Sequence, residues 1–260
     1  MSAEPTLVVH HTSDLLAQAA AARLITRLVD AQGSASTPSL VLTGGGIAAR
    51  TYAAVADSPA HAAVDWGRVD IWWGDERYLP AGHPDRNETQ AREALLNRVP
   101  VDPERVHPMP AADGTSAGDP DQAAADYAEE LRRATRPEHH GQVPAFDVLL
   151  LGLGPDGHVA SLFPEHPELY DERAVTAVHG APKPPPTRLS MTLPTLLSAR
   201  EVWFLVSGAD KARAARLALS GAGQMQIPAA GVRGRQRTLW LLDRDAARDV
   251  PSALVRAASP

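Results

Sequence analysis

The stretch Phe146-Asp-Val-Leu-Leu-Leu-Gly-Leu-Gly-Pro-Asp-Gly-His158 holds the pattern that decides the fold. Its first six residues are almost all apolar, which is typical of a strand buried on both faces, as in a parallel sheet. Gly152 and Gly154 end that strand, and the Pro-Asp-Gly that follows predicts a tight turn. The turn therefore presents His158 just beyond a buried strand.

Short apolar runs of this kind recur along the chain and alternate with longer amphipathic stretches. In residues 13–32, apolar side chains recur every four residues, which places one apolar stripe along a helix. Such alternation of strands and helices predicts an α/β fold with an open, mostly parallel sheet and helices on both faces. The predicted strands are Leu7–His10, Ser39–Thr43, Val69–Trp73, Phe146–Leu151, Glu201–Ser207 and Arg237–Asp243. The predicted helices are Ser13–Gln32, residues 46–55, Asn87–Leu96, Asp119–Arg136 and Ala209–Leu219.

Length and composition narrow the functional classes. The 260 residues suffice for a substantial core, and since no loop is long enough to be a linker, we expect residues 1–260 to form one α/β domain. The net charge of −6 argues against nucleic acid as a partner. The lack of cysteine excludes disulfides, thiolate zinc sites and a cysteine nucleophile. Without a signal-peptide pattern or a membrane-length apolar run, we expect a cytoplasmic protein with no membrane partner.

Three glycines follow the second predicted strand and precede a helix. Glycine lets backbone N–H groups come close to a ligand, and the N-terminus of a helix favours an anion. We therefore predict that Thr43, Gly44 and Gly45 bind a phosphate. A tight turn without a ligand is the alternative, and from this motif alone the two interpretations are evenly balanced.

A charged cluster, Asp75, Glu76 and Arg77, follows the third predicted strand. Ligands of open α/β sheets bind at the carboxyl ends of the strands, so this position favours a site. The alternative is a solvated turn with a local ion pair. Asn87 follows within reach of the same loop and, with Gln90 three residues on, is predicted to cap a helix.

The turn after the fourth predicted strand places Asp156 two residues before His158. A carboxylate can orient an imidazole and increase its basicity, and histidine is suited to removing a proton from water near neutral pH. A structural histidine that closes a loop is the alternative, but the glycine-rich turn beyond a buried strand favours catalysis.

Fixed cations for an anionic substrate are predicted in two later segments. Lys183 and Arg188 flank a rigid Pro-Pro-Pro loop, and charge-assisted hydrogen bonds from such cations can bind phosphate. The alternative is an exposed basic loop without a ligand, and this motif alone favours that alternative. Lys211 falls in the first turn of a predicted helix, where the helix dipole disfavours it unless an anion lies nearby. The remaining histidines show no metal-ligand spacing, and a Gly-x-Ser-x-Gly nucleophile motif is absent from the sequence.

Taken together, these segments resemble the 6-phosphogluconolactonase family. The resemblance implies a Rossmann-like fold shared with sugar-phosphate isomerases. It also implies hydrolysis of 6-phosphogluconolactone to 6-phosphogluconate in the pentose phosphate pathway, with no metal or other cofactor. The matching segments are Trp73-Gly-Asp-Glu-Arg, Gly152-Leu-Gly-Pro-Asp-Gly-His-Val-Ala-Ser-Leu-Phe-Pro, Lys183-Pro-Pro-Pro-Thr-Arg and Val206-Ser-Gly-Ala-Asp-Lys-Ala.

One segment departs from the family pattern. Where the family commonly has Ser-Gly-Gly-Ser-Thr-Pro-Lys, this chain has Thr43-Gly-Gly-Gly-Ile-Ala-Ala. The second serine hydroxyl and the lysine are therefore missing, and Arg50 lies one residue further on. Because backbone N–H groups form the cradle, we expect altered phosphate contacts rather than a loss of activity.

The resemblance leads to a hypothesis for the mechanism. His158 acts as the general base on water, Asp156 orients it, and Arg77 stabilises the oxyanion. The phosphate binds at the Thr43–Gly45 turn with Arg188 and Lys211. Asp75 and Asn87 are also expected to contact the substrate, a small sugar-phosphate lactone.

Two other functions remain open. Glucosamine-6-phosphate deaminases, on a related fold, tend to read Asn-Gly-His-Ile-Gly-Phe-Asn-Glu-Pro at the histidine turn. The run Asp156-Gly-His-Val-Ala-Ser-Leu-Phe-Pro favours the lactonase instead. The second alternative, from a different class, is a non-catalytic sugar-phosphate sensor that has kept the pocket. Asp156 and His158 argue against it.

Overall fold

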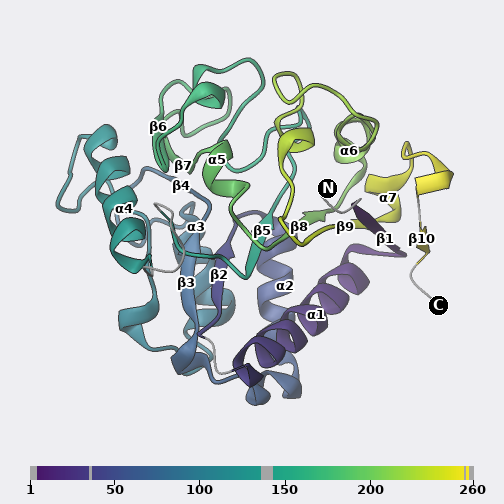
Figure 1. Cartoon of the computed structure of the whole chain (residues 1–260), viewed down its shortest axis with the longest axis horizontal. Helices are drawn as coiled ribbons and strands as arrows, with labels where there is room; N and C mark the ends of the chain where they lie inside the picture. The colour runs from purple at the N-terminus through teal and green to yellow at the C-terminus, as the bar shows by residue number, and fades with distance from the viewer. Residues whose placement is uncertain (1–4, 35–36, 136–142, 255, 258–260) are drawn as a thin grey trace.

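A parallel sheet forms the centre of the molecule (Figure 1). The computed structural model describes residues 5–34, 37–135, 143–254 and 256–257, and within these ranges seven strands pair side by side in the order β10-β1-β9-β8-β5-β2-β3. Every one of these pairings is parallel, which confirms the predicted sheet. The strands are β1 (Thr6–His10), β2 (Ser39–Leu42), β3 (Asp70–Trp73), β5 (Val148–Leu151), β8 (Glu201–Val206), β9 (Arg237–Asp243) and β10 (Arg256–Ala257).

Helices cover both faces of this sheet, as predicted. The chain crosses the sheet from β1 through β2 to β3, and it then returns through β5, β8 and β9 to β10. Because parallel crossovers are right-handed, this reversal places α1 and α2 on one face and α6 and α7 on the other (Figure 1). The helices are α1 (Ser13–Gly33), α2 (Gly46–Asp57), α3 (Asn87–Ala91), α4 (Pro120–Ala134), α5 (Leu193–Leu196), α6 (Ala212–Leu219) and α7 (Arg244–Ala247).

Short helical turns fill several connections. The predicted helix Asn87–Leu96 is α3 followed by a π-helical turn, and the predicted helix Ala209–Leu219 is a 3₁₀ turn followed by α6. Arg136, the predicted end of the fourth helix, lies outside the described residues. The turns are η1 (Pro59–Ala63), η2 (Trp66–Arg68), η3 (Arg92–Leu96), η4 (Pro103–Arg105), η6 (Pro167–Tyr170), η7 (Ala209–Lys211), η8 (Pro228–Gly231) and η9 (Ser252–Leu254).

A second, antiparallel sheet was not predicted. It joins β4 (Asp75–Arg77), β7 (Arg188–Met191) and β6 (Val175–Val178), and α4 packs against it. The sequence does not predict β4 because the three residues of this strand are all charged, whereas strands are usually recognised by alternating or continuous apolar residues. Pairing of Arg77 with Arg188 brings two cations predicted for the site onto neighbouring strands.

The turns after β2 and β5 lie at the point where the chain changes direction across the sheet. These strands are neighbours, but the chain leaves β2 towards α2 on one face and leaves β5 towards the opposite face. In open α/β sheets the crevice at such a point is the usual place for a ligand. Both predicted glycine-rich turns, at residues 43–46 and 152–158, therefore border one crevice.

The prediction that Asn87 caps a helix is wrong. Arg86 occupies the N-cap position of α3, and the first N–H groups of the helix, those of Asn87 and Glu88, donate to the carboxylate of Glu76 at 2.7 and 2.9 Å. A carboxylate from another segment can satisfy the first amides of a helix as well as a local side chain does. Asn87 thus keeps its side chain for other contacts.

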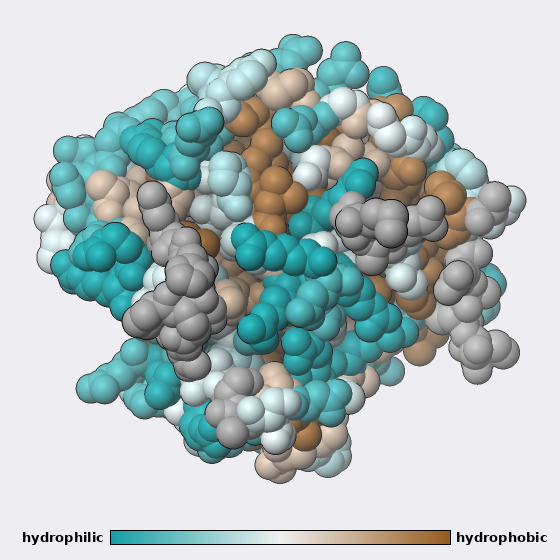
Figure 2. All heavy atoms as spheres, viewed as in Figure 1, coloured by the Kyte–Doolittle hydropathy of each residue, from teal (hydrophilic) through white to brown (hydrophobic). Residues whose placement is uncertain are grey.

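Apolar side chains form the core of the molecule, and hydrophilic side chains lie mainly on its surface. The side chains of β2, β5 and β8 are buried, and together with α1 and α2 they belong to one hydrophobic core. Hydrophilic side chains cover most of the face that Figure 2 shows. Within the described residues, none of the helices has the length and apolar character needed to cross a membrane.

Candidate active site

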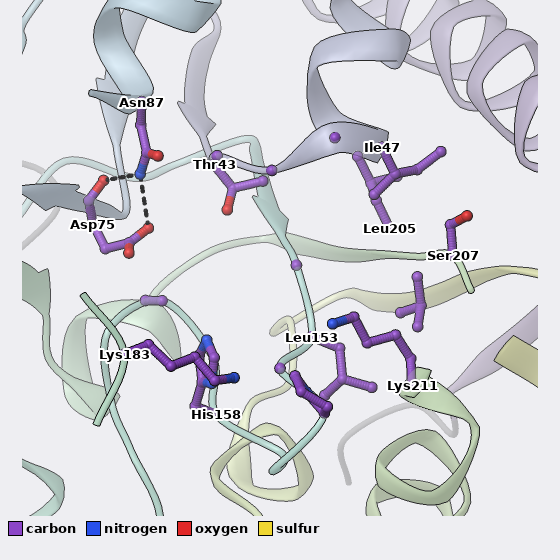
Figure 3. A pocket seen from close by; sticks show the side chains of 18 of the residues that line it. Thr43, Ile47, Asp75, Asn87, Leu153, His158, Lys183, Leu205, Ser207 and Lys211 are labelled. Atoms are coloured by element: carbon purple, nitrogen blue, oxygen red, sulfur yellow. Dashed lines mark hydrogen bonds between the residues drawn. The ribbon is translucent and has the colours of Figure 1, made fainter. Parts of the chain in front are cut away.

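A cavity of about 490 Å³ opens at the carboxyl ends of β2, β5 and β8 (Figure 3). The turns after these strands supply much of its wall, and β4, β7, α3 and the start of α2 supply the rest. The structure thus brings nearly all the predicted site residues to one place. Those that line the cavity are Thr43, Gly44, Gly45, Asp75, Arg77, Asn87, His158, Arg188 and Lys211.

Asp156 and His158 form a hydrogen-bonded pair in the turn after β5. The Nδ1 atom of His158 lies 2.6 Å from Oδ1 of Asp156, and His158 borders the cavity. Among the described residues, Nε2 of His158 has no hydrogen-bond partner. A neutral imidazole held in this way carries its proton on Nδ1, so Nε2 is the atom that can accept a proton from water.

Glycine is required in this turn for two different reasons. A Cβ on Gly154 would lie 2.0 Å from Nδ1 of His158 and 2.4 Å from Oδ1 of Asp156, so a side chain there would displace the pair. Gly157 has φ +89, a conformation that L residues rarely adopt, and Ile227 packs directly against it. The turn is closed by hydrogen bonds from Gly154 N to His158 O and from Gly157 N to Gly154 O.

The charge of Asp156 is held in place by its neighbours. Partial burial raises the pKa of this carboxyl, but the hydrogen bond from His158 and the positive charge of Lys183 outweigh it, so the pKa is well below its ordinary value. The Lys183 ammonium lies 3.4 Å from Asp156 Oδ1, and Figure 3 shows its side chain beside His158. Asp156 is therefore an anion at any pH at which an imidazole can act as a base.

Arg188 is buried and shares a neighbour, Phe163, with His158. Its Nε and Nη2 atoms donate to the backbone carbonyls of residues 183–185, and its guanidinium packs over the ring of Phe163, which also contacts His158. Burial lowers the pKa of Arg188, with Asp75 opposing and Arg77 reinforcing that shift. Among the described residues, Nη1 makes no hydrogen bond, so it is the donor left for a ligand.

Asp75 lies in the cavity wall, with both carboxylate oxygens engaged. Ser161 donates to Oδ2 at 2.7 Å, and the side-chain amide of Asn87 donates to Oδ1 at 3.3 Å and to the backbone carbonyl at 2.8 Å (Figure 3). The amide oxygen of Asn87 is buried against Gly44, where a Cβ would lie only 1.9 Å away. Asn87 therefore connects the turn after β3 with the turn after β2.

The opposite wall is formed by the start of α2 and the turn after β8. Gly45, at φ +104, is the N-cap of α2, and no side chain of the described residues caps it, so the first N–H groups of this helix remain open to a ligand. Lys211 lies across from them and pairs with Asp210 at 2.8 Å (Figure 3). Ser207 also borders the cavity, and its hydroxyl donates to Asp243.

The comparisons with known proteins agree on the family. A family profile described as "Glucosamine-6-phosphate isomerases/6-phosphogluconolactonase" matches residues 11–240. This chain belongs to that family. A 6-phosphogluconolactonase of Streptomyces coelicolor is 60% identical over 260 residues, which is 100% of both chains. One of Mycobacterium tuberculosis is 47% identical over 92% of this chain and 96% of its own length.

Solved structures of the family have the same fold. The 6-phosphogluconolactonase of Trypanosoma brucei superposes with a TM-score of 0.80 at 30% identity, covering 95% of this chain and 99% of its own. A monomeric glucosamine-6-phosphate deaminase superposes with a TM-score of 0.77 at 20% identity. Since the deaminase is under a quarter identical, its likeness shows the fold alone.

The segment that departs from the common family pattern still lines the cavity. Thr43 has its backbone N–H and carbonyl bound to the hydroxyl of Tyr52, which leaves its side chain and the following glycines facing the cavity. Arg50 also borders the cavity, and its Nη1 donates to Ser13 Oγ at 2.8 Å and to Asp14 at 3.2 Å. A cation thus lies near the position where the family pattern has a lysine.

Three contributions were not foreseen from the sequence. Lys183 was predicted as a cation for the phosphate, but its contact with Asp156 was not predicted, and Ser161 donates to Asp75 from the run that follows His158. Glu76 was noted only as part of a charge cluster, and it caps α3. The one available signal was that Ser161 lies within the Gly152–Pro164 run that carries the family resemblance.

Two further observations concern the rim and metals. Arg77 is half-buried at the edge of the cavity, and its Nη1 donates to the carbonyl of Asp85. Over the residues that the structure describes, no group of three or more histidines and carboxylates is placed to hold a metal ion.

Proposed function

We propose that this chain hydrolyses 6-phosphogluconolactone to 6-phosphogluconate, the lactone-opening step of the oxidative pentose phosphate pathway. The observation that carries the proposal is the Asp156–His158 pair, whose free imidazole nitrogen faces a cavity bordered by an open helix N-terminus and Lys211. Membership in the family and the 6-phosphogluconolactonases related to this chain at 60% and 47% identity support it.

The first chemical step is attack of water on the lactone carbonyl. His158 Nε2 takes one proton from the water while the oxygen of the water forms a bond to the carbonyl carbon. Asp156 holds the ring through Nδ1 and stabilises the imidazolium that forms. The negative charge that develops on the carbonyl oxygen is stabilised by Arg77, which borders the same cavity.

The second step breaks the ring. The tetrahedral intermediate collapses, the bond between the carbonyl carbon and the ring oxygen breaks, and the ring oxygen takes the proton from His158. The product is an open-chain acid with a free hydroxyl group, and His158 is neutral again. No oxidant, reductant or metal enters this balance, and we propose that the enzyme needs no cofactor.

The phosphate is assigned to the side of the cavity where α2 begins. Its oxygens accept hydrogen bonds from the turn Thr43–Gly45 and from the side chains of Arg188 and Lys211. Because the whole chain is acidic, this local concentration of donors must supply the affinity for an anion. The Asn87 side chain lies against Gly44 and is bound to Asp75, and we assign the sugar hydroxyls to this part of the cavity.

The decisive experiment is a lactonase assay on freshly prepared 6-phosphogluconolactone, corrected for its spontaneous hydrolysis. We expect rapid, saturable formation of 6-phosphogluconate and little turnover of glucosamine 6-phosphate. Release of ammonia from glucosamine 6-phosphate would favour a deaminase instead. Tight binding of 6-phosphogluconate without turnover of the lactone would identify a sugar-phosphate sensor.

A further inference from the structure

Glu76 is a buried carboxylate for which the proposed reaction has no role. It lies between Asp75 and Arg77 in β4, and because successive residues of a strand face opposite sides, it points away from the cavity that its two neighbours border. Its side chain is 0% exposed. A buried charge is costly unless several donors satisfy it, so the surroundings of Glu76 have a specific purpose.

Four donors surround this carboxylate. The backbone N–H groups of Arg77, Asn87 and Glu88 donate to it at 2.8, 2.7 and 2.9 Å, and Nη2 of Arg86 lies 3.7 Å away. Two of these N–H groups are the first of α3. Glu76 therefore fixes the start of α3 against β4 more firmly than a local cap would, since it is itself held in the sheet.

The residue fixed most directly is Asn87. Its backbone is bound to Glu76, while its side chain reaches Asp75 in one direction and lies against Gly44 in the other. The space between Gly44 and the Asn87 side chain is small, because even a Cβ on Gly44 would lie 1.9 Å from the amide oxygen of Asn87. Any shift of α3 thus moves both Asp75 and the first glycine of the phosphate turn.

We propose that Glu76 is a positioning residue that sets the distance between Asp75 and the Gly44 turn through Asn87. The proposal rests on the function proposed above, since those two elements are assigned to opposite parts of one substrate. Glu76 acts by keeping Asp75 and the Gly44 turn correctly placed around the substrate during turnover. Misplacement of a reacting group by about an ångström costs on the order of 100-fold in rate, so kcat should fall more than KM rises.

The test compares Glu76→Gln with Glu88→Gln. The first variant keeps size and burial but turns an amide N–H towards backbone donors. The second removes one charge beside the same buried Arg86 and leaves the cap of α3 intact. We expect Glu76→Gln to lower kcat by about 10- to 100-fold and Glu88→Gln to leave it nearly unchanged, with both proteins folded at the assay temperature.

A double variant separates positioning from simple loss of stability. In an Asn87→Ala background, Glu76→Gln should cause little further loss of kcat if Glu76 acts through Asn87, because coupled residues are not additive. If instead the losses multiply, or if Glu88→Gln lowers kcat as much as Glu76→Gln does, the proposal is wrong. Should Glu76→Gln not fold, Glu76→Asp keeps the charge, withdraws the carboxylate by one methylene and must show the same fall in kcat.

Amide hydrogen exchange gives a readout that does not depend on activity. Glu76→Gln should accelerate exchange at Asn87 and Glu88, whereas Glu88→Gln should not. A wild-type protein without lactonase activity would overturn the proposed function while the exchange data still test the link from Glu76 to α3. Normal wild-type activity with unchanged exchange and kcat in Glu76→Gln would overturn this inference alone.

Discussion

The two glycine-rich turns beside the cavity follow neighbouring parallel strands, yet they offer a ligand different groups. The turn after β5 presents side chains, and Gly154 is glycine because the imidazole of His158 and the carboxylate of Asp156 occupy the space of a Cβ. The turn after β2 presents backbone N–H groups. A Cβ on Gly46 would meet nothing within 4 Å, and Gly45 is constrained only by its φ of +104.

This difference explains why one motif keeps the family pattern and the other departs from it. A site made of side chains depends on residue identity at each position, so the family pattern is easily recognised in the sequence from Gly152 to Pro164. A site made of backbone N–H groups depends on conformation, and several sequences can adopt it. Replacement of the serine and lysine of the family pattern by Gly46 and Ala49 is therefore compatible with a phosphate cradle.

The largest effect on kcat is expected in the turn after β5, which presents the side chains of Asp156 and His158. His158→Ala removes the only group of that turn able to take a proton from water, and general-base catalysis is worth about 10²–10⁴-fold. We expect kcat to fall by that factor with little change in KM, as measured in the corrected lactonase assay. A variant within a few-fold of the parent would exclude His158 as the base.

A pair of glycine variants compares the two turns directly. Gly154→Ala must push the Asp156–His158 pair aside, and a displacement of that kind costs about 100-fold in kcat. Gly46→Ala, in the first turn of α2, has open space and should leave kcat nearly unchanged. Equal losses in both variants, with unfolding temperatures unchanged, would contradict the distinction between the turns.

The phosphate assignment is tested by Lys211→Ala and Arg188→Ala. A charge-assisted hydrogen bond contributes about 1.5–3 kcal/mol, so each variant should lose about 10- to 150-fold in kcat/KM for the phosphorylated lactone. Slow turnover of unphosphorylated gluconolactone should hardly change. Proportional losses on both substrates would place these cations at the carbonyl or in the fold rather than at the phosphate.

The last prediction concerns the pH dependence of stability rather than activity. Burial raises the pKa of Glu76 from 4.5 to about 7, although Arg86 and three backbone N–H groups oppose the shift. The folded chain therefore binds a proton between these pH values that the unfolded chain releases. Stabilisation from this group is complete below about pH 4.5 and is lost as the pH rises through about 7.

The size of this effect is on the order of 3 to 4 kcal/mol, at about 1.4 kcal/mol for each unit of pKa. Urea unfolding of the wild type and Glu76→Gln at about pH 5 and about pH 8 measures it. The wild type should lose stability relative to the variant as the pH rises. A constant difference between the two proteins would show that Glu76 does not titrate in this range.

Most of the sheet could be predicted because its strands are buried on both faces. Continuous apolar runs such as Val148–Leu151 leave a clear signal, and the amphipathic stripe of α1 does the same for a helix. The small sheet was missed because β4 consists of Asp75, Glu76 and Arg77, whose polar groups are satisfied by residues outside the strand, at separations from 8 to 86 positions. The hydropathy pattern of the three residues themselves does not indicate these partners.

The role of Asn87 in the site also could not be predicted from the local sequence. An asparagine three residues before a glutamine is a reasonable helix cap, and local rules predict it as one. The carboxylate of Glu76, eleven residues earlier, takes the two amides instead. Only the packing of α3 against β4 decides which of two competent groups forms the cap.

The sequence by itself determined the individual strands of the parallel sheet, the two glycine-rich turns that follow β2 and β5, and the pairing of Asp156 with His158, because each depends on residues close together in the chain. The tertiary structure decided how these pieces form one cavity. It joined the turns after β2, β5 and β8 at the point where the chain reverses across the sheet, and it bound Asp75 to Ser161 and Asn87. Contacts of this second kind link residues far apart in sequence, and their free energy depends on burial that exists only once the chain has folded.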